Sequence, residues 1–234
     1  MAIGRSPRLG LGGSVAVKRF DEVFEHMTVR LHRGDLPDLT RYTDSVAIDT
    51  ETMGLHPHRD RLCVVQLSSG DGSADVVQIP KGHGKGPADA PNLKALLGNP
   101  KVTKIFHFAR FDLAALYNAL GVMPQPVYCT KIASRLPRTY TDRHGLKDLV
   151  REVLNIDLSK QQQSSDWGAP ALTEAQLAYA ASDVLHLHGL RERLDAMLAR
   201  EGRLELAQAC FDFLPSRARL DLQGWDSEDI FAHS

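Results

Sequence analysis

Cysteine is scarce in this chain, and the positions of the cysteines exclude two kinds of site. Cys63, Cys129 and Cys210 are odd in number and lie far apart. They form no CxxC pair, so neither a zinc site nor a disulfide framework is indicated. All of them lie in apolar stretches, and we expect buried thiols in a reducing, cytoplasmic compartment.

Long apolar runs and net charge are lacking as well. No run approaches the roughly 18 residues that a membrane span needs, so we expect no membrane association. The formal net charge is only −1. Such a chain has no overall attraction for nucleic acid, but a local basic patch is enough to hold a few phosphates. A nucleic-acid substrate therefore stays open at this point.

The chain of 234 residues suits one domain with a full core. Its first 26 residues are basic and glycine-rich and lack the continuous apolar segment of a secretory signal. We expect residues 1–26 to be a poorly ordered extension, or a mis-assigned start before Met27. An organelle transit peptide is the weaker alternative. Residues 27–234 are expected to form a single domain.

Strand-like runs come first and then alternate with helical segments, which predicts an α/β fold with helices on both faces of a mixed sheet. The strands are expected at 28–32, 45–49, 61–68, 74–80, 102–106 and 127–128, with an antiparallel meander between 45 and 80. The helices are expected at 92–97, 111–120, 131–136, 146–154, 173–200 and 204–213, the last ended by Pro215. Beyond it, Trp225, Ile230 and Phe231 are expected to dock on this or a neighbouring subunit.

Residues 45–55, SVAIDTETMGL, join an apolar strand to two acids. Asp49 and Glu51 follow the apolar run with one residue between them. Because alternate side chains of a strand share a face, both carboxylates point the same way. Two like charges so close repel each other unless a cation lies between them, and a divalent metal ion is the usual solution.

Two later segments carry further acids. Asp112 follows a predicted strand and opens a helix, where an α/β sheet places ligand-binding groups. Tyr179 and Asp183 are four residues apart and lie one turn apart on one helix face. An isolated helical aspartate is usually a solvated surface residue. The neighbours of Asp183 are small or apolar, however, so its face is expected to be buried and the acid needs a partner.

Four carboxylates without a His or Cys ligand favour hard, oxygen-binding cations. We expect Asp49, Glu51, Asp112 and Asp183 to hold two divalent ions, Mg²⁺ or Mn²⁺. Two such ions roughly 3.5–4 Å apart can activate a water and stabilise the leaving 3′ oxygen of a phosphoryl displacement. Tyr179 is expected first to orient the attacking water and only second to remove a proton, because a phenol with a pKa of about 10 is a poor base.

In this order, Asp49-x-Glu51, Asp112 in HFARFD and Tyr179-xxx-Asp183 resemble the exonuclease motifs of the DEDD superfamily. The histidine branch places a His five residues before the last Asp, where this chain has Ala178, so the resemblance is to the tyrosine branch. SKQQQSSDW at 159–167 and the following LTEAQLAYAASDVLHL resemble ribonuclease D. HRDRLCVVQLS, KIFHFARFDLA and RTYTDRHGLK resemble the nanoRNase C family, and this likeness covers nearly all of residues 27–234.

The resemblance implies an RNase H-like exonuclease fold with a mixed five-stranded sheet flanked by helices. It also implies metal-dependent 3′→5′ exoribonuclease activity on very short RNA, especially diribonucleotides, releasing nucleoside 5′-monophosphates. The implied partners are short RNA, with single-stranded DNA as a second substrate, and further copies of the chain in a ring-shaped homo-octamer. Residues 1–26 and the loop at 81–91 depart from the family pattern.

The first motif and the segment before Asp112 supply four candidates for substrate contacts. Leu55 is expected to wedge between two bases, as the equivalent leucine does in related short-oligonucleotide nucleases, with ordinary core packing as the alternative. Met53 belongs to the same segment. His107 and Phe108 are expected to contact sugar or base, and for Phe108 core packing is an equal alternative.

The segment SKQQQSSDW supplies the candidates for recognising a 5′ phosphate. Lys160, Gln163 and Ser165 are expected to cap it, which a site selective for dinucleotides requires. The basic excess between residues 131 and 151 could bind phosphate as well. A merely solvated helix face is the competing view of that excess.

Two other functions stay open. One is a broader ribonuclease D-like 3′ exonuclease acting on longer RNA or DNA. The other, from a different class, is a catalytically inactive nucleic-acid-binding module. The complete set of Asp49, Glu51, Asp112, Tyr179 and Asp183 argues against the inactive module.

Overall fold

The computed structural model describes residues 27–56, 58–82, 88–159 and 161–233. The expectations for residues 1–26 and for Lys160 lie outside these residues. Within them, one mixed sheet runs in the order β1-β4-β3-β2-β5-β6. Its strands are β1 (Thr28–Arg33), β2 (Ser45–Thr52), β3 (Leu62–Ser68), β4 (Ser73–Gln78), β5 (Thr103–Phe106) and β6 (Val127–Cys129).

The expected α/β fold with a mixed sheet is confirmed, but the sheet has six strands rather than five. β1 pairs in parallel with β4 along its whole length and adds a strand at that edge. The expected meander is present, because β2–β3 and β3–β4 are antiparallel. The β3–β4 turn places Gly70 and Gly72 at φ +84° and +83°, where a side chain would be strained. β5 and β6 then add in parallel beside β2.

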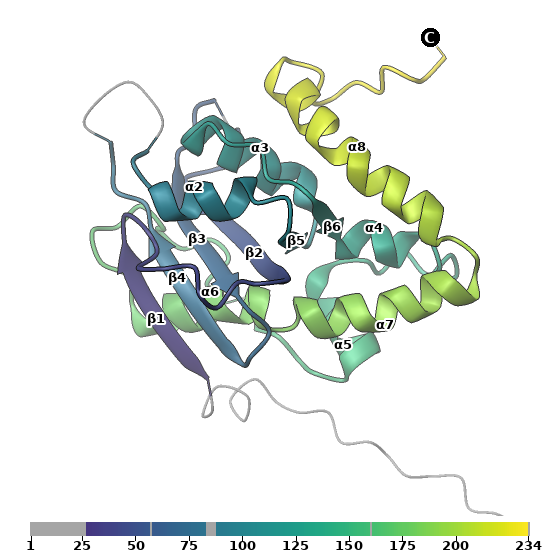
Figure 1. The fold of residues 1–234 in the computed structure, drawn as a ribbon, viewed down its shortest axis with the longest axis horizontal. Helices are drawn as coiled ribbons and strands as arrows, with labels where there is room; N and C mark the ends of the chain where they lie inside the picture. Colours follow the sequence, from purple (N-terminus) through teal and green to yellow (C-terminus); the bar gives the residue numbers. More distant parts are fainter. Residues whose placement is uncertain (1–26, 57, 83–87, 160, 234) are drawn as a thin grey trace, which may run out of the picture.

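Helices cover both faces of the sheet, with α6 on one face and α2 and α3 on the other (Figure 1). The helices are α2 (Pro91–Gly98), α3 (Ala109–Leu120), α4 (Thr130–Arg135), α5 (Leu146–Leu154), α6 (Glu174–Leu185), α7 (Leu187–Arg200) and α8 (Leu204–Leu222). No helix in the described part of the chain is long and apolar enough to span a membrane.

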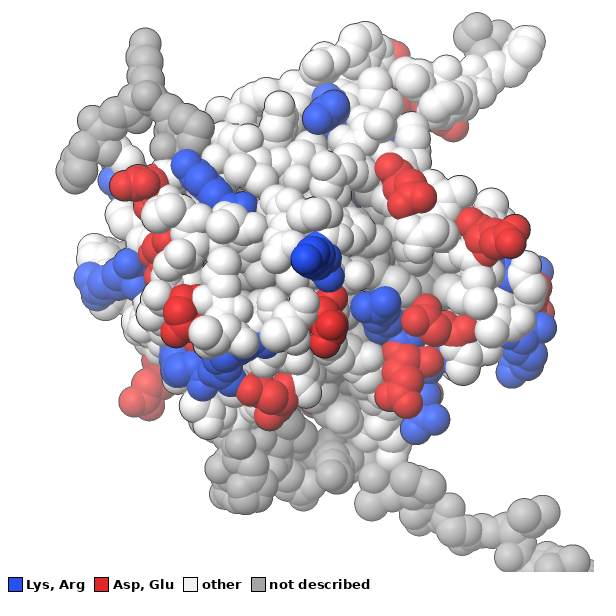
Figure 2. Space-filling model, in the orientation of Figure 1, with Lys and Arg blue, Asp and Glu red and all other residues white. Residues whose placement is uncertain are grey.

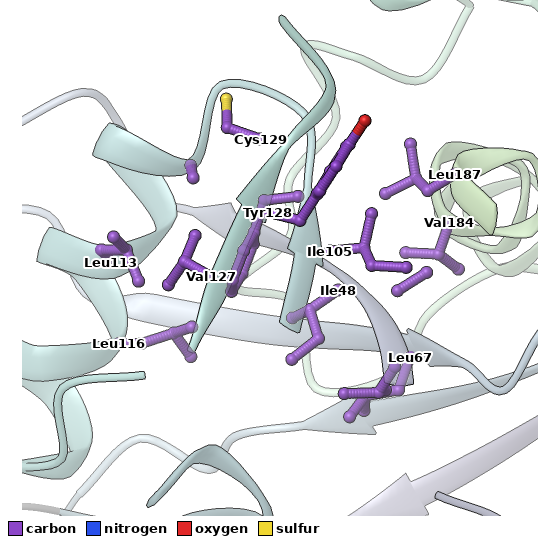
Figure 3. Close-up of a cluster of buried hydrophobic side chains, with 14 of the residues drawn as sticks. Ile48, Leu67, Ile105, Leu113, Leu116, Val127, Tyr128, Cys129, Val184 and Leu187 are labelled. Atoms are coloured by element: carbon purple, nitrogen blue, oxygen red, sulfur yellow. The ribbon is translucent and has the colours of Figure 1, made fainter. Parts of the chain in front are cut away.

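The main core lies between the central strands and the helices that cover them. Ile48 of β2 and Ile105 of β5 are fully buried, as are Leu113 and Leu116 of α3 (Figure 3). At the other side of this cluster, Val184 belongs to α6 and Leu187 to α7 (Figure 3). The core therefore fixes α3 and α6, the two helices with predicted site residues, against the central strands.

Two helix predictions are wrong in detail. The segment expected as one helix at 173–200 is divided at His186 into α6 and α7. The last helix does not end at Pro215 but continues to Leu222. A proline inside a helix removes one backbone hydrogen bond. Here the helix persists because Phe211, Leu214 and Ala218 bury its face against the core.

The surface and the ends of the fold differ partly from expectation. Cys63 and Cys129 are buried as expected, whereas Cys210 is only half-buried. The apolar residues of the tail are largely exposed, and the Phe231 ring meets Phe213 of α8 at 5.8 Å. Figure 2 shows basic and acidic side chains interspersed over one face, as a near-neutral chain predicts.

Candidate active site

The central strand β2 carries the first two acids. Val46, Ala47 and Ile48 in its first half are buried, and it pairs with β3 on one side and β5 on the other. Asp49 and Glu51 alternate with Thr50, so the two carboxylates share one face of the sheet. The β2–β3 register shifts between Glu51 and Thr52, which ends regular pairing just beyond the second acid. The strand thus presents both acids where the sheet opens.

Helix α6 brings Tyr179 and Asp183 to the same face. It begins at Thr173, whose hydroxyl accepts from the backbone N–H of Gln176, while the Gln176 side chain accepts from the backbone N–H of Thr173. This capping box confirms the start that the sequence indicated. Oxygen atoms of Asp49, Glu51 and Asp183 all lie within 4.8 Å of one another. Three of the four predicted acids therefore form a compact group.

Asp112 reaches the site from the other side of β2. It lies in the first turn of α3 and is only 3% exposed. The hydroxyl of Thr50 donates a hydrogen bond of 2.7 Å to one oxygen of Asp112. Asp112 is not one of the three acids within 4.8 Å of one another, but it lies close enough for its charge to raise the pKa of Glu51.

Asp112 is buried and the other three acids are half-buried, and none of the four carboxylates has a cationic partner among the described residues. Burial, the largest cause, raises the pKa of Asp49 to about 7. Burial together with the charge of Asp49 raises the pKa of Glu51 to about 10. Burial and then Asp49 likewise raise the pKa values of Asp112 and Asp183 well above the usual range. Full ionisation of such a cluster at neutral pH needs positive charge from a bound ion.

The donor set fits divalent cations of the Mg²⁺ or Mn²⁺ type. The candidate ligands are carboxylate oxygens, with neither His nor Cys among them, and such hard oxygens suit these ions. Three of the acids already converge within bonding reach of a common ion. The residues present therefore fit the metal site that the motifs predict.

Tyr179 lies against this cluster. It is 8% exposed, and its hydroxyl donates a hydrogen bond to Asp183. Burial and the neighbouring acids, Asp183 first, raise the pKa of Tyr179 well above its ordinary value. The phenol therefore keeps its proton at neutral pH and is suited to donate a hydrogen bond rather than to act as a base.

A pocket of about 360 Å³ opens beside the acids. Asp49, Glu51, Tyr179 and Asp183 line one part of it. The remaining wall is more varied and includes His107, Phe108, Lys131, Lys147, Leu158, Ser159 and Gln163. The pocket thus combines a carboxylate cluster with two lysines and an aromatic ring, which are groups that suit a metal-bound phosphate and a base.

Phe108 and His107 line this pocket in different ways. The Phe108 side chain is not in the core: the residue is 46% exposed, and the Lys131 ammonium lies 4.2 Å from its ring centroid. Its backbone is left-handed at φ 66°, which is uncommon for a bulky residue. His107 Nδ1 lies 2.8 Å from the Thr130 hydroxyl, and burial lowers the pKa of His107 to about 3. His107 is therefore neutral at physiological pH.

The other residues predicted to contact the substrate do not all line this pocket. Gln163 lines the pocket, but Ser165 does not, and its hydroxyl donates to the Gln162 side chain at 2.5 Å. Leu55 is 80% exposed and lines a neighbouring pocket of about 830 Å³ together with Phe108. Met53 is 53% exposed and lies close to Gly168.

Sequence reasoning missed the group that holds Asp112. Thr50 lies between the two acids of the first motif, and nothing in its local sequence shows that it will contact α3. Its partner is 62 residues away along the chain. Lys131 and Lys147 belonged to a basic excess whose role was open, and both line the pocket.

A family model described as 3′-5′ exonuclease matches residues 35–199. NrnC from Brucella melitensis, solved with bound Mg²⁺, is 62% identical over 89% of this chain and 100% of that chain, with a TM-score of 0.84. The same protein solved with bound pGG is 63% identical over the same shares of both chains, also with a TM-score of 0.84.

Ribonuclease D from Acidiphilium cryptum is 39% identical over 160 residues. That alignment covers 68% of this chain and 39% of the relative. The chain thus spans about two fifths of the length of such curated ribonuclease D relatives.

Proposed function

The chain belongs to the 3′-5′ exonuclease family, and from this premise we propose that it is a metal-dependent 3′→5′ exoribonuclease acting on very short RNA. Its preferred substrates are diribonucleotides, and its products are nucleoside 5′-monophosphates. The observation that carries this proposal is the convergence of Asp49, Glu51 and Asp183 within 4.8 Å, beside a pocket lined by Tyr179. The binding of Mg²⁺ and of pGG by Brucella NrnC supports the metal and the substrate length.

Asp49, Glu51, Asp112 and Asp183 would hold two Mg²⁺ or Mn²⁺ ions. These ions supply a water activated as a nucleophile and stabilisation of the leaving 3′ oxygen. The protein residues position the ions and the attacking water. β2, α3 and α6 hold the four carboxylates from three directions. Tyr179 keeps its proton and orients the attacking water through its hydroxyl.

The substrate is held by groups around the metal ligands. The positive charges of Lys131 and Lys147 offset the negative charge of the phosphates. His107 is neutral and contributes no positive charge. Phe108 presents an exposed ring to a base. Leu55, on the rim of the neighbouring pocket, wedges between the two bases. Gln163 remains a candidate for binding the 5′ phosphate. Ser165 does not line the pocket, so its loop would have to rearrange before it could bind the phosphate.

The test is cleavage of 5′-phosphorylated RNAs of two to seven nucleotides at equal concentration, in Mg²⁺ and in chelator. We expect the dinucleotide to be hydrolysed far faster than the longer RNAs, and only in Mg²⁺. Equal trimming of all lengths would favour a broader 3′ exonuclease. Binding without cleavage in Mg²⁺ would favour an inactive binding module.

Parallel cleavage of single-stranded DNA of the same lengths tests the second substrate. Cleavage of the DNA series at a rate similar to that of RNA would remove the preference for ribose from the proposal. Exclusive cleavage of RNA would remove single-stranded DNA.

The homo-octamer and the cytoplasmic location stay predictions. What supports self-association is the apolar surface of α8 and the segment after it, where Phe213, Trp225, Ile230 and Phe231 are each at least 40% exposed. Mass measurement in solution tests the octamer. A monomeric mass would contradict it, and the catalytic proposal does not depend on the outcome.

A further inference from the structure

Gln66 is a fully buried amide with no hydrogen-bond partner. It lies in the middle of β3 and has no exposed surface. Neither its Oε1 nor its Nε2 atom makes a hydrogen bond within the described structure. Buried polar groups are almost always paired, so an amide with both ends unpaired needs a physical explanation.

The strand register places this amide beside the acids. Gln66 pairs directly with Asp49 across β2 and β3. Side chains directly opposite each other on antiparallel strands share a face, with Cβ atoms about 4.5–5.5 Å apart. Gln66 therefore points to the face that carries Asp49 and Glu51, the face covered by α6.

Around Gln66 this face is mostly apolar, and the hydroxyl of Ser68, two residues further along β3, already donates to the Ser73 carbonyl. On β3, Val64 precedes Gln66 by two residues, and on β4 Val76 is its direct partner. Both valines pack in one buried cluster with Tyr179 and Ala180 of α6. The nearest groups that could use the amide are thus the carboxylates of the acid cluster, Asp49 above all.

Gln78 is a glutamine on the same sheet whose side chain already has a hydrogen-bond partner. It lies on β4 opposite Val64, and its Nε2 donates to the backbone carbonyl of Ala169 at 2.8 Å. The Gln78 side chain therefore binds a loop to the sheet, whereas the Gln66 side chain makes no hydrogen bond. The difference suggests that Gln66 has a partner only when a metal ion is bound at the acid cluster.

We propose that Gln66 is a positioning residue for the metal site, whose amide donates to the Asp49 carboxylate, directly or through one water, when a divalent cation is bound. The inference rests on the proposed function only in requiring that the acid cluster binds a divalent cation. In the metal-free protein the amide makes no hydrogen bond. In the metal-bound protein it would hold the Asp49 carboxylate in the orientation that binds the ion. Such outer partners typically alter metal affinity by about 10–100-fold.

The experiment compares Gln66→Met with the wild-type chain by thermal unfolding and by calorimetric titration with Mg²⁺, in the absence of RNA. Methionine has a similar size but no hydrogen-bonding group. In chelator we expect a melting temperature equal to that of the wild type or about 2–4 °C higher, because an unpaired buried amide is removed. With Mg²⁺ we expect a smaller gain in melting temperature than in the wild type, and a Mg²⁺ dissociation constant about 10-fold larger.

Gln78→Met is the matched control. It removes a half-buried amide that already has a partner, so it should lower the melting temperature equally in chelator and in Mg²⁺ and leave the Mg²⁺ dissociation constant unchanged. If Gln66→Met behaves like Gln78→Met, Gln66 is an ordinary structural residue and the proposal is overturned.

Gln66→Leu is a second apolar variant in case methionine does not pack. If both variants fail to fold even in Mg²⁺, the amide serves the fold and the proposal is wrong. If the wild type itself gains no stability from Mg²⁺, the proposal fails together with the metal site. If the wild type binds Mg²⁺ but cleaves no short RNA, only the proposed function fails, because the Gln66 measurements need no substrate.

Discussion

The same sheet holds carboxylates in two places, one with cationic partners and one without. On the β1–β4 edge, Asp75 is 5% exposed and accepts from Arg30, at 2.7 Å, and from the Tyr42 hydroxyl, at 2.6 Å. His32 Nε2 lies 2.9 Å from the same carboxylate. On the β2–α6 face, Asp49, Glu51 and Asp183 are close together without a cationic partner among the described residues.

The comparison separates a structural acid from a functional one without any knowledge of the reaction. A buried charge whose partners are all supplied by the chain needs no ligand, and removing one of the partners destabilises the fold. A group of half-buried carboxylates that the chain leaves without a counter-charge costs stability, and it persists only if a ligand supplies the charge. We expect the variants below to act with opposite signs in the two places.

The largest effect is expected at the unpartnered cluster. Asp49→Asn should lower kcat about 1000-fold, since a lost metal ligand removes several kcal/mol of transition-state stabilisation. The same substitution should raise the melting temperature in chelator, because it removes one of the mutually repelling acids. Steady-state cleavage of a dinucleotide and thermal unfolding measure the two quantities. Unchanged activity at saturating Mn²⁺ would remove Asp49 from the ligand set.

Tyr179→Phe should have the next largest effect. Losing the hydroxyl that orients the attacking water should lower kcat about 100-fold and leave KM almost unchanged. The ring contact with Trp167, at 6.0 Å between centroids, is preserved, so the fold should not change. Single-turnover kinetics with a dinucleotide measures the chemical step. A kcat equal to that of the wild type would disprove the orienting role.

At Asp75, whose carboxylate has partners, a substitution should change the stability of the fold rather than the activity. Asp75→Asn should lower the free energy of unfolding by about 2 kcal/mol, because it weakens charge-assisted hydrogen bonds from Arg30 and Tyr42. The kcat of the folded fraction should stay the same. Denaturant unfolding and activity per folded molecule are the measurements. A loss of activity larger than the loss of folded protein would contradict the structural assignment.

The smallest and most gradual effect is expected from pH. In the metal-free protein Asp49 keeps its proton up to about pH 7, whereas in the unfolded chain an aspartate releases it near about pH 3.9. The folded state therefore binds more protons between these values, and the free energy of unfolding falls as the pH rises through this window. Metal binding ionises the acids, so Mg²⁺ should reverse this fall.

Thermal unfolding between pH 4 and pH 8, in chelator and in Mg²⁺, measures this dependence. Asp49→Asn in chelator is the control, and its dependence on pH should be weaker than that of the wild type. Stability in chelator that rises steadily from pH 4 to pH 7 would mean that the acids are not held protonated by burial.

Local spacing was sufficient to predict which site residues share a face within one strand or one helix. Asp49 and Glu51 had to share a face because they alternate on a strand, and Tyr179 and Asp183 because they lie one helical turn apart. The helix start expected at residue 173 also agrees with the structure, since the groups that cap it are only three residues apart. These features depend on contacts within a few residues, and such contacts are the ones that sequence patterns record.

What the sequence could not show depends on contacts between distant segments. The hydrogen bond from Thr50 to Asp112 and the pairing of Gln66 with Asp49 both follow from how strands and helices assemble. The helix that continues through Pro215 does so because of tertiary burial, which overrides the local preference of proline. β1 was visible as a strand, but its place in the sheet was not, because a parallel partner gives no local turn signal.

One property of β2 has a practical use. Asp49 and Glu51 face the α6 side, and Thr50 between them faces Asp112 on the other side. A slip of one residue in strand pairing would exchange these sides, turning the acids toward α3 and the hydroxyl toward α6. A chain folded with that error would retain a sheet and would be inactive. Specific activity in a purified sample therefore reports the fraction of molecules with correctly aligned strands, and it can serve as a quality test of refolded protein that spectroscopy of secondary structure cannot provide.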